Sequence, residues 1–118
     1  KLCNLNLPSL EYLEIWVSRN KLKEVNIDNL APILSAKFCK NLVYLAIRKS
    51  NNTSQLAKAI INSPIIKNLK ILELTDGNMG SGGAMAILES PVINKLHTLN
   101  LSGNRLQTKM IQRLSQLF

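Results

Sequence analysis

The chain has 118 residues and a mass of 13.2 kDa, which is the size of a single domain. Apolar residues make up 46% of the chain and charged residues 19%, a composition that excludes an intrinsically disordered protein. Fifteen Lys and Arg residues against seven Asp and Glu residues give a net charge of +8, which raises the hypothesis of a nucleic-acid partner. No apolar run approaches the roughly 18 residues that a membrane-spanning helix needs.

The first predicted strand lies near residues 12–16. It belongs to an apolar triplet of the form L-x-x-L-x-L, here Leu10, Leu13 and Ile15, whose last two members share a face because side chains alternate along a strand. An earlier triplet over residues 2–7 begins only eight residues before Leu10, which leaves no room for a strand and its return segment. We interpret it as the tail of a preceding unit, and we expect the chain to be a fragment of a longer array.

The connection to the second strand is the longest. Residues 18–28 predict an inserted loop, and apolar residues at helical spacing over residues 30–34 predict a helix. The second triplet then predicts a strand near residues 43–47. Asn52 and Gln55 have the spacing of a capping box at the start of the next predicted helix.

The third triplet predicts a strand near residues 71–75. The glycine-rich segment 77–83 after it lacks the Gly-Lys-Ser/Thr ending of a phosphate-binding loop, so we interpret it as a tight turn. Ser81 begins a predicted helix that stops before Pro91. The fourth triplet predicts a strand near residues 98–102, and a last helix follows with apolar residues at helical spacing: Met110, Ile111, Leu114 and Leu117.

The four triplets recur at regular spacing. Their middle leucines are residues 13, 45, 72 and 99, so the spacings are 32, 27 and 27, close to the 20–29 residues of a leucine-rich repeat. Parallel neighbouring strands need crossovers, which the predicted helices supply. We therefore predict one α/β domain over residues 1–118: a leucine-rich repeat solenoid, a right-handed βα superhelix with a curved parallel sheet on its concave face and helices on its convex face.

The fourth copy carries a family resemblance. Residues 96–106 match the consensus L-x-x-L-x-L-x-x-N-x-L, and the chain resembles ribonuclease-inhibitor-like leucine-rich repeat proteins. This resemblance implies that Asn104 satisfies backbone groups at the turn after the strand. The corresponding residue of the third copy is Gly77, a second candidate turn residue, and the second copy has Ser50 there.

Other segments resemble a narrower group. Residues 7–16, 28–34 and 74–77 are similar to a family of bacterial cytoplasmic leucine-rich repeat proteins of unassigned function. The resemblance implies a fold and brings no chemistry with it. Cys3 and Cys39 are the only cysteines, and we expect them to be reduced, which also favours a cytoplasmic location.

Residues that alternate with the leucines are predicted to line the concave face. They form three columns across the strands, namely Tyr12, Tyr44, Ile71 and Thr98; Glu14, Ala46, Glu73 and Asn100; and Trp16, Arg48, Thr75 and Ser102. Because Tyr, Trp and Arg are enriched at binding hot spots, we predict a partner-binding surface on this face. Its candidate residues are Tyr12, Glu14, Trp16, Tyr44, Arg48, Ile71, Glu73 and Thr75. The alternative is that the aromatic residues pack against a preceding repeat or the inserted loop.

The sequence offers little to catalysis. His97 is the only histidine, so no second imidazole is available for a metal site. Glu14 and Glu73 are expected about 10 Å apart on an open wall that would not shift their pKa values. We expect no enzyme activity, no catalytic residue, no metal and no cofactor.

The predicted function is therefore a protein-interaction module with a protein partner. Two alternatives are a nucleic-acid-binding module driven by net charge and purely structural spacer repeats. The lysines fall mainly on the predicted outer face, and no three basic residues are adjacent, which argues against nucleic acid. We also predict end-to-end self-association through apolar residues at the two ends: Leu2, Leu5, Leu7, Leu117 and Phe118.

Overall fold

The computed structural model describes residues 10–17, 34 and 41–117. Its elements in chain order are β1 (Tyr12–Trp16), β2 (Tyr44–Arg48), α2 (Thr53–Ile61), η2 (Pro64–Lys67), β3 (Ile71–Thr75), α3 (Ser81–Glu89), η3 (Ile93–Lys95), β4 (Thr98–Asn100) and α4 (Thr108–Ser115). The predictions for residues 2–7, for the loop 18–28, for both cysteines, for Phe118 and for the helix over 30–34, Leu34 apart, fall outside these described residues.

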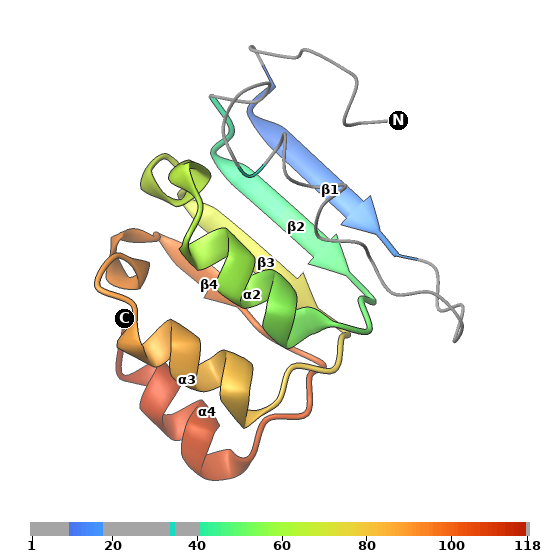
Figure 1. The fold of residues 1–118 in the computed structure, drawn as a ribbon, viewed down its shortest axis with the longest axis vertical. Helices are drawn as coiled ribbons and strands as arrows, with labels where there is room; N and C mark the ends of the chain where they lie inside the picture. Colours follow the sequence, from blue (N-terminus) through green and yellow to red (C-terminus); the bar gives the residue numbers. More distant parts are fainter. Residues whose placement is uncertain (1–9, 18–33, 35–40, 118) are drawn as a thin grey trace.

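The four strands form one parallel sheet in the order β1-β2-β3-β4 (Figure 1). This confirms the predicted α/β class with a parallel sheet. The structure places β2 one residue later than the predicted 43–47, and it ends β4 at Asn100 instead of residue 102. Ser102 therefore lies in the turn after β4, beyond the last paired residue.

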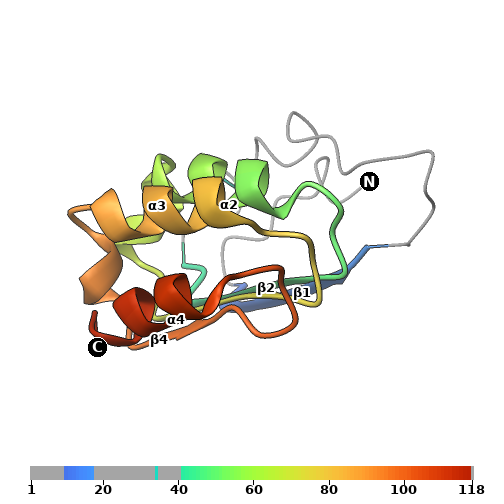
Figure 2. The same ribbon diagram turned by 90° about the horizontal axis from the view of Figure 1, so that it is seen from below.

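The core lies between the sheet and the helices. The inward residues of the two central strands, Leu45, Ile47, Leu72 and Leu74, are at most 1% exposed. From the helices, Leu56, Ile60, Ala84 and Ile87 meet them and are fully buried. Burying each leucine or isoleucine contributes about 1.5–3 kcal/mol. Seen edge-on, the sheet carries α2 and α3 on one side only (Figure 2), so within the described residues its other side is free of helices.

The turns after β2, β3 and β4 have the same backbone conformation. Lys49, Asp76 and Gly103 have φ values of 64°, 55° and 75°. Each stands two residues after the last apolar residue of its triplet, and they are spaced by 27 residues, as 49, 76 and 103. This left-handed conformation costs a non-glycine residue about 1–2 kcal/mol, so its recurrence at Lys49 and Asp76 means that the surrounding turn enforces it.

Backbone hydrogen bonds between neighbouring units also recur. The N–H of Lys49 donates to Thr75 O, and 27 residues later that of Asp76 donates to Ser102 O, each at 2.9 Å. A second pattern recurs where the strands begin. In each of the three pairs of neighbouring strands, a carbonyl just before one strand accepts hydrogen bonds from two successive N–H groups at the start of the next strand. These carbonyls belong to Glu11, Val43 and Lys70. Successive strands are therefore joined in the same way.

The predicted capping box is wrong. Asn52 is the N-cap residue of α2, but its side chain makes no capping hydrogen bond. The Thr53 N–H donates instead to Asn78 Oδ1 at 3.0 Å, and the Asn78 N–H donates to Thr53 Oγ1 at 3.0 Å. The loop after β3 thus caps α2, the helix that precedes β3 in the chain. A local sequence pattern does not reveal this contact.

Asn104 joins the loops of two units. Its Nδ2 donates to the carbonyls of Leu74 and Leu101, at 2.7 and 2.8 Å, and its Oδ1 accepts from the Met79 N–H at 3.0 Å. Gly77, at the corresponding place of the preceding unit, is packed so closely that a Cβ there would lie 2.1 Å from Thr53 Oγ1. Only glycine fits that position without a shift of its neighbours.

Candidate functional site

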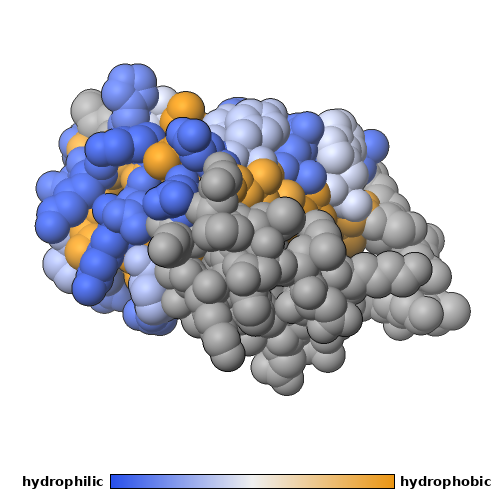
Figure 3. Space-filling view, turned by 90° about the horizontal axis from the view of Figure 1, so that it is seen from above, coloured by the Kyte–Doolittle hydropathy of each residue, from blue (hydrophilic) through white to orange (hydrophobic). Residues whose placement is uncertain are grey.

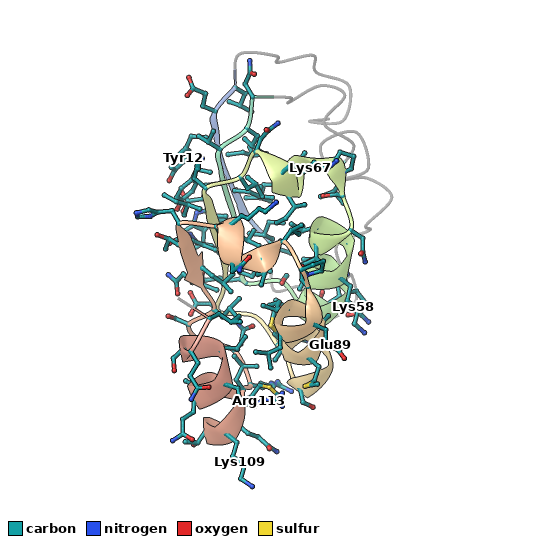
Figure 4. The ribbon with its side chains drawn as sticks, turned by 90° about the vertical axis from the view of Figure 1, so that its left-hand side faces the viewer. Tyr12, Lys58, Lys67, Glu89, Lys109 and Arg113 are labelled. Carbon is teal, nitrogen blue, oxygen red and sulfur yellow. The ribbon has the colours of Figure 1, made fainter. Side chains whose placement is uncertain are left out.

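The side of the sheet that carries no helices is called here the helix-free face. The strand register places the predicted columns side by side: Tyr12, Tyr44 and Ile71 in one; Glu14, Ala46 and Glu73 in the next; Trp16, Arg48 and Thr75 in the third. All eight candidate residues of the predicted surface therefore lie on this face of the strands, although Thr75 is buried there. In Figure 4, Tyr12 lies on the sheet side of the molecule, whereas Lys58 and Lys67 lie on the helix side.

Two tyrosines stack on this face. The rings of Tyr12 and Tyr44 have their centroids 4.0 Å apart and their planes at 8° to each other. Cross-strand aromatic pairs of this kind contribute about 0.5–1.5 kcal/mol beyond their burial. Tyr12 is still 54% exposed. It is a large aromatic surface in a fixed orientation.

Arg48 is held on two sides by carboxylates. Its Nη2 lies 2.7 Å from Glu73 Oε1, and its Nε is paired with Glu14 Oε2. The guanidinium also donates to Thr75 Oγ1 at 3.0 Å and to the Tyr44 hydroxyl at 3.1 Å, and that hydroxyl donates to Glu73. Arg48 therefore has one defined position, set by contacts with three strands.

The network continues onto the fourth strand. Asn100 Nδ2 donates to Glu73 Oε2 at 3.2 Å, and Asn100 Oδ1 accepts from Ser102 Oγ at 2.7 Å. Glu14, Arg48, Glu73 and Asn100 thus form a polar chain with one residue from each strand, which we call the cross-strand network. Charge-assisted hydrogen bonds of this kind stabilise a protein more than neutral ones do.

The environment fixes the charge states of the network. The hydrogen bond that Tyr44 donates to Glu73, together with burial, raises the pKa of the Tyr44 hydroxyl well above its usual value. The same hydrogen bond, helped by Arg48 and Asn100, lowers the pKa of Glu73. Hydrogen bonds to Glu14 and Glu73 raise the pKa of Arg48. These interactions favour a charged Glu73, a charged Arg48 and a neutral Tyr44 hydroxyl.

Trp16 is the most exposed aromatic residue of the face, at 60%. Arg48 Cζ lies 5.7 Å from its ring centroid, and Lys49 Nζ lies 5.3 Å from it. Each cation–π contact at an exposed site contributes about 0.5–1 kcal/mol. Trp16 is thus oriented by two cations of its own chain.

Lys49 and Asn100 join the site although the sequence did not single them out as binding residues. Lys49 reaches Trp16 from a turn with positive φ, which its sequence does not signal. Asn100 was predictable only as a member of a column, because its bond to Glu73 depends on side-chain orientation.

The helix-free face is not basic, although the chain is. Two carboxylates, Glu14 and Glu73, share the single guanidinium of Arg48, so the cross-strand network keeps one negative charge. In Figure 3 this face forms the upper rim of the molecule, where pale and hydrophilic residues lie above a band of hydrophobic ones.

Other features of the described residues offer no second site of this kind. His97 is exposed, with Nδ1 2.9 Å from Thr98 Oγ1, and no three His, Cys, Asp or Glu residues within residues 10–17, 34 and 41–117 are grouped to hold a metal.

A hollow of about 420 Å³ lies at the edge of β4, between the turn that follows β4 and α4. Half of its lining residues are apolar, and the other half are Asn100, Ser102, Gly103, Asn104 and Ser115. Across the described part of the chain, no helix has the length and apolar composition to cross a membrane.

Comparison with known proteins supports the fold alone. No protein-family model matches the chain, and a search of curated proteins finds no match. The crystal structure of a protein from Bacteroides fragilis is similar over 96% of this chain, with a TM-score of 0.86 and 23% sequence identity. The chain spans 33% of the length of that protein. The same arrangement of a parallel sheet and helices is thus present within a longer bacterial protein of known structure.

Proposed function

We propose that this chain is a non-catalytic protein-interaction module built as a leucine-rich repeat solenoid of the ribonuclease-inhibitor-like type. Two repeating features support the solenoid: the positive-φ turn residues 27 residues apart, and the backbone hydrogen bonds that recur from strand to strand. In such a solenoid the helix-free face is the concave surface, since helices take more room than strands.

The observation that carries the binding proposal is the exposure of two aromatic residues on a rigid polar base. Tyr12 and Trp16 are 54% and 60% exposed, and both rings are held by neighbouring side chains. Preorganised aromatic residues bind at a low cost in conformational entropy, which is why Trp and Tyr dominate interface hot spots. The ion pairs beneath them fix the orientation of the partner.

The test compares aromatic truncations with a matched control. Trp16→Ala and Tyr12→Ala should each weaken binding to a purified partner, identified by capture from the source organism, by at least 2 kcal/mol in calorimetry. Ile111→Ala on α4 removes a hydrophobic side chain of similar exposure, 51%, from outside this face and should leave the affinity unchanged. Unchanged affinity of both aromatic variants would refute the proposal, as would an equal loss in the control.

A further inference from the structure

Charge is unevenly distributed over the described residues. The helix-free face and the ends of its strands hold four carboxylates, those of Glu11, Glu14, Glu73 and Asp76, against three cations, those of Arg48, Lys49 and Lys70. Elsewhere in the described residues there are six basic side chains, those of Lys58, Lys67, Lys95, Arg105, Lys109 and Arg113, and one acidic side chain, that of Glu89. A partner that complements this face is therefore cationic, whereas a polyanion would be drawn elsewhere on the molecule.

Glu14 is the charged group of the network that a partner reaches most easily. Its side chain is 30% exposed, compared with 17% for both Arg48 and Glu73. It is joined to Arg48 through Oε2, while Arg48 also pairs with Glu73. The charge of Arg48 is shared between two carboxylates, so the negative excess of the network is accessible at Glu14.

Aromatic rings stand on both sides of Glu14. Tyr12 and Trp16 lie two residues before and after it on β1 and so share its face, each about 7 Å away along the strand. Trp16 already has two cations of this chain against its ring. Tyr12 has Tyr44 against its ring and is still more than half exposed. Tyr12 and Glu14 together therefore present a π surface beside a carboxylate.

We propose that Tyr12 and Glu14 bind an arginine side chain of the partner protein. The planar guanidinium stacks on the exposed Tyr12 ring and donates hydrogen bonds to the Glu14 carboxylate. Arginine fits this pair better than lysine because its guanidinium is planar, weakly hydrated and able to stack and pair at once. This inference rests on the proposed function and names the chemistry that the partner must present.

The test is a nuclear magnetic resonance titration of the isotope-labelled protein with N-acetyl-arginine amide. Saturable shifts are expected at the amides of residues 12–16, with millimolar affinity. The citrulline analogue has nearly the same shape without the charge, and it should bind about tenfold more weakly, since a hydrogen bond to a charged group contributes about that factor. Glu14→Gln should lower the arginine affinity to a similar extent. Glu89→Gln, an exposed carboxylate on α3, should not change it.

The proposal is overturned if citrulline binds as well as arginine, or if Glu14→Gln and Glu89→Gln behave alike. It is also overturned if a single-stranded oligonucleotide shifts the amides of residues 12–16, because a polyanion would then occupy the same face. The citrulline comparison uses the unaltered chain and stays decisive if a variant fails to fold. A partner that needs Tyr12 and Trp16 but no arginine would remove this inference alone, whereas a partner insensitive to both aromatic residues would remove the proposed function.

Discussion

Tyr44 stacks on Tyr12 with its ring and donates its hydroxyl proton to Glu73, so one side chain joins the aromatic and the ionic parts of the helix-free face. Its hydroxyl also accepts from Arg48 Nη2 at 3.1 Å. The ring contact reaches β1 and the hydroxyl contact reaches β3, on either side of the strand that bears Tyr44. Tyr44 is thus the residue at which these two kinds of contact can be separated experimentally.

Tyr44→Phe keeps the ring stack and removes the hydroxyl. We expect a loss of about 1–2 kcal/mol in the free energy of unfolding, because Glu73 and Arg48 each lose a hydrogen-bond partner. The pKa of Glu73 should move back toward its ordinary value, since the Tyr44 hydrogen bond is the main cause that lowers it. Urea denaturation measures the first effect, and a carboxyl-detected pH titration measures the second. An unchanged Glu73 pKa would show that the hydroxyl does not bond to it in solution.

The lowered pKa of Glu73 predicts how stability depends on pH. A carboxyl group whose pKa is lower in the folded state stabilises the protein fully above its unfolded value, here 4.5, and that stabilisation is lost as the pH falls through the folded value. The free energy of unfolding should therefore decrease as the pH is lowered below about 4.5. Glu73→Gln should remove this part of the dependence and lower the stability at neutral pH. Denaturation curves at a series of pH values would test it, and a Glu73→Gln curve parallel to that of the unaltered protein would contradict it.

Asn104→Ala should be strongly destabilising. The substitution removes two donated hydrogen bonds and one accepted bond, and it leaves the Leu74 and Leu101 carbonyls without that amide. We expect a loss of about 2–4 kcal/mol in the free energy of unfolding. Asn94→Ala, at an exposed position of η3, is the matched control and should change stability by less than about 0.5 kcal/mol. Equal effects of the two substitutions in thermal or chemical denaturation would contradict the linking role of Asn104.

Two glycine substitutions should have opposite effects. A Cβ on Gly77 would clash with Thr53 Oγ1, so Gly77→Ala should destabilise the protein by about 1–3 kcal/mol. Gly82 lies within α3 with nothing within 4 Å of a Cβ, so Gly82→Ala should stabilise it by up to about 1 kcal/mol. Melting temperatures that shift in the same direction for both variants would argue against the close packing at Gly77.

The sheet and the residues of its open face could be predicted because both follow from period-two alternation. Leu45 and Ile47 must point to one side of their strand, so Tyr44 and Arg48 must point to the other. The repeat spacing then sets which residues are neighbours across strands, as with Glu14, Ala46 and Glu73.

The hydrogen bonds of the site and the cap of α2 could not be predicted in this way. Arg48 bonds to both Glu14 and Glu73, which lie on the two strands beside its own. These bonds depend on side-chain rotamers, whereas alternation along a strand determines only the face to which a side chain points. Asn78, which caps α2, lies 25 positions after Thr53, whereas a capping box joins residues that are only three positions apart. Both kinds of contact join residues about 25 or more positions apart, and a local sequence pattern does not encode them.

The cross-strand network has a practical consequence for mutagenesis of the helix-free face. Glu14, Arg48, Glu73 and Asn100 complete one another's hydrogen bonds, so exchanging one of them leaves its neighbours incomplete. Screens of individual substitutions would then report losses of folding where a change in surface chemistry was intended. Libraries that vary these four positions jointly, with Tyr12 and Trp16 retained, are the better starting material for designing a new surface on this sheet.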